Sequence, residues 1–98
     1  MANKQKGVVE ITLDKKRKLK FDLNAFAEIE DTLGVPMSRM SEIEMGMKTV
    51  RTLLYAGLLH EDEEMTERKA GSLVTMENME EVQKAIGEAF AAAAPAKN

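Results

Sequence analysis

Several residue types are missing or scarce in this 98-residue chain. It has no cysteine and no tryptophan, and it holds one histidine, one tyrosine and two prolines. Without cysteine it can form neither a disulfide framework nor a cysteine-based zinc site or nucleophile. No apolar run approaches the roughly 20 residues that a membrane-spanning helix needs. This composition fits the cytoplasm, and we expect no membrane partner.

The scarcity of histidine also bears on catalysis. His60 stands beside the acidic run Glu61–Glu64, and four consecutive acids in a loop cannot all turn toward one cation. No serine or threonine has an evident base nearby, and neither the nucleophile-elbow nor the phosphate-loop pattern occurs. The acidic run is expected to be a solvated loop. The sequence therefore predicts a protein that is not an enzyme and binds no metal or cofactor.

The overall amino-acid composition is typical of a folded domain. Apolar residues make up 44% of the chain and charged residues 32%, which is enough for one core and too balanced for a disordered tail. The length suits a single domain. We expect that domain to span residues 1–94, with residues 95–98 as a frayed tail after Pro95 ends the last helix.

Charge is distributed unevenly along the chain. Residues 1–20 hold seven lysines and arginines against two acids, whereas the remaining residues hold seven against fifteen, so a local charge of +5 precedes one of −8. A basic end can bind nucleic acid. However, aromatic residues that would stack on bases are nearly absent, and lysines on a hairpin commonly protect its edge. No nucleic-acid partner is therefore expected, although a small nucleic-acid-binding regulator stays an alternative.

Two segments alternate with the period of a β-strand. Residues 8–13 and 18–23 each place apolar side chains on one face, and the short polar stretch Asp14–Arg17 separates them. The pattern predicts an antiparallel hairpin. Because a lone hairpin is marginal in water, its apolar face must pack on the rest of the chain. That face is expected to comprise Val9, Ile11, Leu13, Leu19, Phe21 and Leu23.

Helical spacing follows the hairpin. A helix is expected over residues 25–33 with Asn24 as its cap and Gly34 as its stop. Residues 38–44 are expected to be a separate helical turn, and the long helix is expected to begin near Met47. Thr66, and Asn78 with Glu81, have the positions of caps for two further helices. The sequence predicts an α+β fold, in which an N-terminal antiparallel hairpin is followed by four to five short helices forming a small bundle.

Methionine is unusually frequent, with eight residues in the chain. Thioether side chains fill irregular cores and also adapt to varied partners, so both interpretations stay open for each position. Met47 and Met79 lie on helical stripes, which favours the core. A wide apolar face at the end of the long helix, helped by two methionines near helix ends, is expected to bind protein. Its residues are Tyr55, Leu58, Leu59, Met37 and Met40.

Several segments together resemble a known family. A basic hairpin is followed by four segments in a fixed order. They are the acidic segment Phe26–Gly34, the segment Arg51–Leu58 with its Leu-Tyr-Ala-Gly-Leu ending, the segment Thr66–Gly71 and a final alanine-rich helix. This order over residues 7–94 resembles the small tail assembly chaperones of long-tailed bacteriophages, prophages and gene transfer agents. Ser38–Gly46 and the basic turn Lys15–Lys18 depart from the resemblance.

The resemblance implies a function that composition and spacing do not. Proteins of this family are thought to coat the long, helical tape-measure protein while tail-tube subunits assemble around it in the host cytoplasm. The expected partners are therefore the tape-measure protein and the tail-tube protein, with homo-oligomers possible. Because some relatives carry a tail-tube label, a structural tail protein is the nearest alternative.

Overall fold

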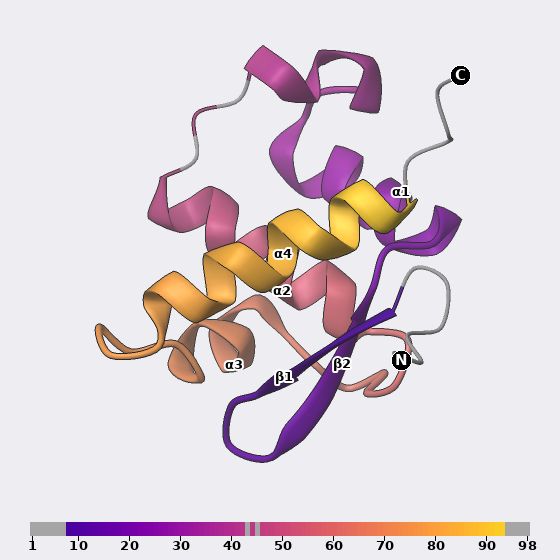
Figure 1. Ribbon diagram of the computed structural model, residues 1–98. Helices are drawn as coiled ribbons and strands as arrows, with labels where there is room; N and C mark the ends of the chain where they lie inside the picture. The colour runs from indigo at the N-terminus through magenta and orange to yellow at the C-terminus, as the bar shows by residue number, and fades with distance from the viewer. Residues whose placement is uncertain (1–7, 43, 45, 94–98) are drawn as a thin grey trace.

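The computed structural model describes residues 8–42, 44 and 46–93, so the tail predicted at residues 95–98 lies outside the described residues. Within these residues, two antiparallel strands precede one 3-10 helix and four α-helices (Figure 1). This arrangement confirms the predicted α+β fold. The elements are β1 (Val8–Thr12), β2 (Lys16–Lys20), α1 (Leu23–Leu33), η1 (Met37–Glu42), α2 (Met47–Leu58), α3 (Glu67–Ser72) and α4 (Met79–Ala93).

The hairpin follows the predicted alternation. Val9 lies opposite Leu19 and Ile11 opposite Arg17, so side chains of both strands share one face. Val9, Ile11, Leu19 and Phe21 are buried and Leu13 packs partly against them, which confirms the predicted burial of these five residues.

Leu23 does not follow the predicted strand alternation. It is 80% exposed, because the strand period stops at Asp22 and the helical period begins there. The Asp22 carboxylate accepts a hydrogen bond from the Ala25 backbone N–H at 2.9 Å and caps α1. Leu23 is thus the first residue of a helix and not the last of a strand, and the predicted cap at Asn24 was wrong by two positions.

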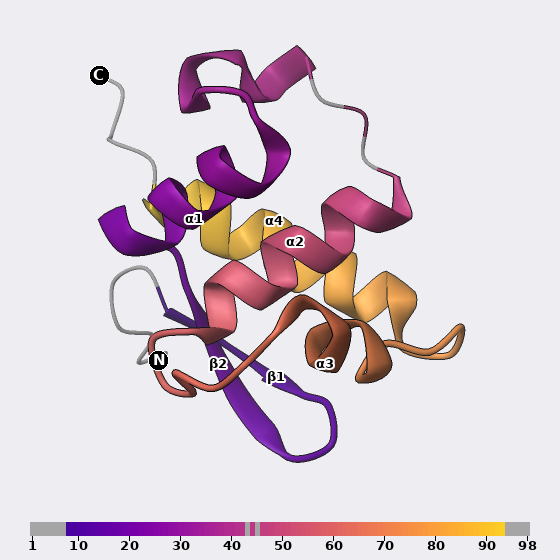
Figure 2. The ribbon, with the colours of Figure 1, turned by 180° about the vertical axis from the view of Figure 1, so that it is seen from behind.

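Helices α2 and α4 cover the apolar face of the hairpin. In Figure 1 α4 passes in front of α2, and the reverse view in Figure 2 brings α2 forward, with the hairpin below both. The rings of Phe21, Phe26 and Phe90 meet between the hairpin, α1 and α4, with the Phe21 and Phe90 centroids 4.7 Å apart. A single cluster of buried side chains therefore connects strands and helices from both ends of the described chain.

Most of the observed helix ends agree with those predicted from the sequence. Gly34, at φ +75°, closes α1 in the left-handed conformation that glycine adopts without strain. The helical turn expected at residues 38–44 is the 3-10 helix η1, and α2 begins at Met47. Ile43 and Met45 lie outside the described residues.

The caps of the last two helices differ from each other. Thr66 caps α3 as predicted, because its hydroxyl accepts a hydrogen bond from the Lys69 N–H at 3.0 Å. The Asn78 side chain instead bonds backward, accepting from the Thr75 N–H and donating to the Leu73 carbonyl. It therefore stabilises the turn before α4.

One residue of the basic turn is buried on the core face. Arg17 is 7% exposed, and its guanidinium donates to both carboxylate oxygens of Asp14 at 2.8 and 3.0 Å, with Asp62 at 3.6 Å. The hydrogen bond from Arg17 lowers the pKa of Asp14 from 3.8 to about 2. The same pair raises the pKa of Arg17. A residue expected in a solvated turn is thus part of β2.

The loop after α2 binds the outer edge of β2. Glu61 Oε1 accepts a hydrogen bond from the Lys18 N–H at 3.0 Å, and His60 Nε2 lies 2.7 Å from the Lys18 carbonyl oxygen. The carbonyl can only accept, so Nε2 carries the proton. The acidic run predicted to be a solvated loop therefore has two carboxylates, Glu61 and Asp62, that contact the hairpin.

Candidate functional site

The structure describes the side chains of three of the five predicted protein-binding residues, Tyr55, Leu58 and Leu59. Leu58 is 0% exposed, so its assignment as a contact residue was wrong. The reason is that α2 lies between the hairpin, α1, α3 and α4 and buries most of its circumference. The stripe that contains Leu58 faces the core and is not available to a partner.

Tyr55 and Leu59 lie at the same end of α2 and are half-buried. The Tyr55 hydroxyl donates a hydrogen bond to Glu28 Oε1 at 3.1 Å, which ties α2 to α1. Burial, followed by the contact with Glu28, raises the pKa of Tyr55. These residues pack against the core with one side and reach the surface with the other, so their binding role stays a prediction.

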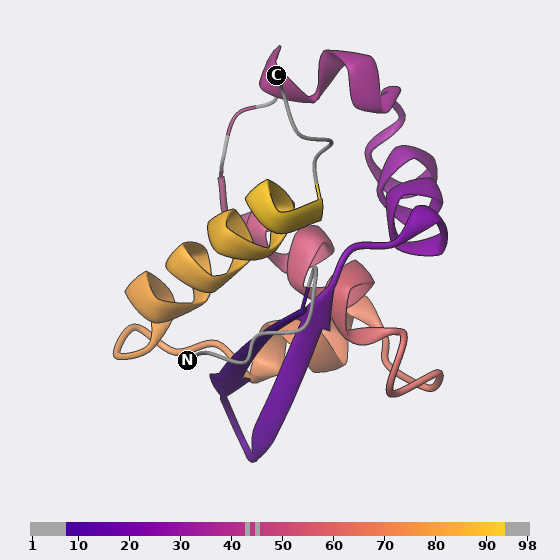
Figure 3. The same cartoon turned by 45° about the vertical axis from the view of Figure 1, so that its right-hand side comes forward.

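Met37 and Met40 belong to η1, but their side chains lie outside what the structure describes. Figures 1 and 3 place η1 at the far end of the molecule beyond α1, whereas the last turn of α2 lies near the hairpin. The backbone of η1 therefore lies apart from the last turn of α2, and the binding role of Met37 and Met40 stays a prediction.

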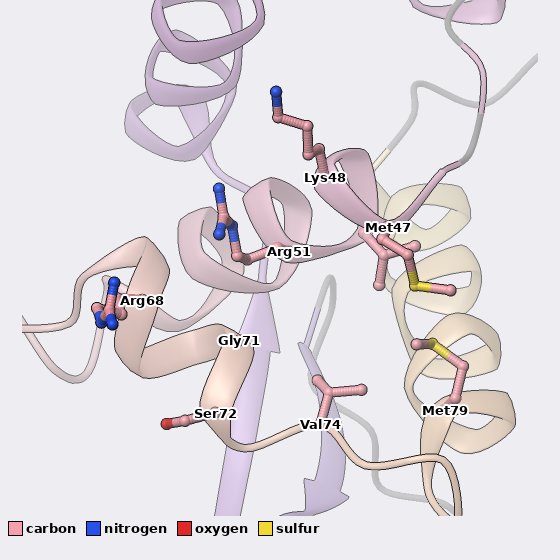
Figure 4. A pocket seen from close by; sticks show the side chains of 9 residues that line it. Met47, Lys48, Arg51, Arg68, Gly71, Ser72, Val74 and Met79 are labelled. Atoms are coloured by element: carbon pink, nitrogen blue, oxygen red, sulfur yellow. The ribbon is translucent and has the colours of Figure 1, made fainter.

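A different surface combines apolar and charged side chains. A groove of about 520 Å³ lies between the first turns of α2, the helix α3 and the start of α4 (Figure 4). Helices α2 and α3 are joined by the Thr52 hydroxyl, which donates to Glu67 Oε2 at 2.8 Å. The lining residues of this α2–α3–α4 groove are Met47, Lys48, Val50, Arg51, Arg68, Gly71, Ser72, Val74 and Met79.

The apolar wall of the groove is formed by thioethers. Figure 4 shows Met47 of α2 and Met79 of α4 on the same side of the opening. Met47 is 66% exposed and Met79 is half-buried, so the core interpretation of Met47 was wrong. The stripe through Met47, Val50 and Leu54 begins one turn before the core does, which leaves its first residue in solvent.

The opposite wall is cationic. Lys48, Arg51 and Arg68 line it, and the lining residues include no aspartate or glutamate. The Arg51 Nε atom is buried and has no hydrogen-bond partner among the residues that the structure describes. Gly71 allows this arrangement, because a Cβ there would lie 3.0 Å from Arg51 Cδ. The absence of a side chain at Gly71 thus lets the arginine stem lie on α3.

Sequence reasoning missed this groove, although one signal was present. Met47 and Arg51 are four residues apart and therefore share a face of α2. A methionine and an arginine on one face indicate an amphipathic surface. The contributions of Arg68 and Val74 depend on how α3 packs on α2, which no local spacing encodes.

Three comparisons were made with known proteins. Neither the protein-family models, nor the curated proteins, nor the solved structures contain a match to this chain. Among the described residues, no helix combines the length and apolar character that crossing a bilayer requires. No group of three or more histidine, aspartate or glutamate side chains in that same part of the chain could hold a metal ion.

Proposed function

We propose that this chain is a non-catalytic protein-binding scaffold, and specifically a tail assembly chaperone that binds the tape-measure protein and assists tail-tube assembly in the host cytoplasm. The observation that carries the binding role is the open α2–α3–α4 groove, whose Met47 wall the chain itself leaves exposed. The tail-assembly context comes from the resemblance of residues 7–94 to that chaperone family.

The chemistry of the groove suits a helical client. Methionine side chains are unbranched and polarizable, so they adapt to the uneven apolar face of a helix. Helix-in-groove binding uses such a surface to receive side chains spaced by three or four residues. Two further large apolar side chains are exposed, Leu23 at 80% and Met76 at 90%. Single exposed apolar residues are normal on a protein surface, so the groove and not these two residues carries the proposal.

Two alternatives receive less support. A tail-tube subunit would continue its sheet into neighbouring subunits, but the described residues hold one two-stranded sheet. The outer edge of its β2 is bonded by His60 and Glu61. A nucleic-acid-binding regulator would use the basic hairpin, but Arg17 is buried and paired with Asp14.

Co-expression tests the proposed function. The proposed function predicts a tape-measure gene beside the gene for this chain, and the product of that gene is made alone, with the wild-type chain, and with Met47→Glu or Leu59→Glu. We expect the wild-type chain to increase the soluble fraction of the client, and at least one charged variant to lose that effect while keeping a near-normal melting temperature. Ala91→Glu, on the exposed side of α4, is the control and should act as the wild type does. Equal client solubility with and without the wild-type chain would reject the chaperone function.

A further inference from the structure

We propose that the α2–α3–α4 groove receives an acidic amphipathic helix of the partner, with the apolar face of that helix on Met47 and Met79 and its carboxylates beside Lys48, Arg51 and Arg68. This inference rests on the proposed function, because it takes the client to be a helical protein. It adds which surface binds and which sequence character in the client is recognised.

Charge complementarity selects an acidic occupant. The whole chain carries a net charge of −3, yet the groove lining holds three cations and no carboxylate. None of the three cations forms an ion pair with another described residue. Helix α2 also begins at this groove, with no side-chain cap at Gly46 and no acid in its first turn. The positive end of the helix dipole therefore adds to the charge of the three side chains.

Arg51 supplies an independent argument. A buried donor without an acceptor destabilises a folded protein, so such a group needs a reason to be there. Arg51 Nε is in this state among the described residues, and its guanidinium lies at the groove. The buried Nε fixes the arginine stem on α3, and a partner carboxylate entering the groove can accept two parallel hydrogen bonds from the terminal nitrogens of the guanidinium.

The apolar wall favours an amphipathic helix over a simple anion as the ligand of the groove. Val74 lies between the two walls at the base of the view in Figure 4, with Met47 and Met79 beside it. A free anion gains no binding free energy from these side chains, whereas leucines on one side of a helix would bury apolar surface against them. The volume of about 520 Å³ suits a few side chains of such a helix and falls in the range of ordinary binding pockets.

Three synthetic peptides test the chemistry. Each has about 18 residues, or five helical turns, and carries a fluorophore for anisotropy titration against the full chain. The first has a leucine stripe flanked by glutamates. The second replaces the glutamates with lysines, and the third replaces the leucines with serines. We expect the first to bind at least about tenfold more tightly than either other peptide, because both charge and apolar contact are needed.

Variants of the chain locate the site. Arg68→Glu and Met47→Ser should each weaken binding of the acidic peptide about tenfold. Lys69→Glu on the same short helix is the matched charge control, and Met76→Ser is the matched thioether control. Arg51→Met is the variant that best separates an effect on binding from an effect on stability. It should weaken binding while leaving the melting temperature unchanged or raised, since it removes a donor that has no acceptor.

Several results would overturn the inference. Equal binding of the glutamate and lysine peptides would reject charge recognition, and equal loss with Lys69→Glu would reject this site. If the chain self-associates in sedimentation, and Arg68→Glu abolishes that while no peptide binds, the groove is a contact between copies. If the wild-type chain and Arg68→Glu solubilise the co-expressed tape-measure protein equally, the proposed function stands and this surface is wrong.

Discussion

Gly57 of α2 lies against Leu19 of β2 so closely that a Cβ at position 57 would be 2.9 Å from Leu19 Cδ2. The same Cβ would lie 3.2 Å from the Phe21 ring. Both Leu19 and Phe21 are buried, so neither has open space into which to move. The glycine therefore sets how near the long helix approaches the hairpin.

Gly57→Ala is expected to destabilise the domain. Overpacking a filled core costs about 1 to 3 kcal/mol, which exceeds the gain of roughly 1 kcal/mol from better helix propensity. Gly87→Ala in α4 is the matched control, because nothing lies within 4 Å of a Cβ there. That variant should stabilise by roughly 0.5 to 1 kcal/mol. Chemical unfolding of both measures the contrast, and an equal change in the two would contradict the close packing.

Phe21→Ala is expected to lower the free energy of unfolding by about 3 kcal/mol, because it empties a buried aromatic site. The ring also meets Phe90 edge-on at 4.7 Å, which the alanine cannot replace. Leu23→Ala, two residues later, should change stability by less than about 0.5 kcal/mol since Leu23 is exposed. Urea unfolding measures both. A comparable loss in the two variants would mean that the apolar strand face extends to Leu23.

Asp14 should make stability depend on pH in acid. Its pKa is lowered from 3.8 to about 2 by the hydrogen bond from Arg17, so its contribution is complete above about pH 5. That contribution is lost as the pH falls toward 2. Asp14→Asn should therefore be less stable than the wild type at neutral pH, and the difference should shrink between about pH 5 and 2. Asp31→Asn, on the exposed side of α1, is the control for removing one carboxylate.

Glu61→Ala should expose the Lys18 amide. The Glu61 carboxylate accepts from the Lys18 N–H at 3.0 Å, so removing it leaves that N–H to water. Amide hydrogen exchange of Lys18 is expected to become several-fold faster, whereas Leu19 should be little changed because it pairs with Val9 inside the hairpin. Glu63→Ala in the same loop should leave the Lys18 amide as it is in the wild type. Unchanged exchange in both variants would contradict the edge contact.

The sequence determined much of the fold and less of the surface. Val9, Ile11, Leu19 and Phe21 follow a strict period of two, so their burial could be predicted locally. Leu23 continues that period by chance, because the cap at Asp22 had already changed the backbone to helix.

Charged and terminal positions were harder to predict. Arg17 looked like a solvated turn residue, because the strand was expected to begin at Lys18, whereas β2 begins at Lys16 and places Arg17 on the same face as Leu19. The helical stripe correctly joined Leu58 to the long helix, yet it could not tell which face a neighbouring helix would cover. It also placed Met47 inward, although α2 extends one turn beyond the core there. These outcomes depend on how the helices pack on each other, which spacing within one helix does not encode.

The ion pairs between the hairpin and the loop after α2 also affect how quickly a charged partner could arrive. Arg17 meets Asp14 of its own hairpin and Asp62 of the distant loop, so the field of the guanidinium is largely cancelled at a distance. The cations at Lys48, Arg51 and Arg68 have no such neighbours in the groove lining. An acidic partner is therefore attracted to the groove by three cations that no acid of the groove lining neutralises. Its association rate should fall as salt is added, while its dissociation rate changes much less.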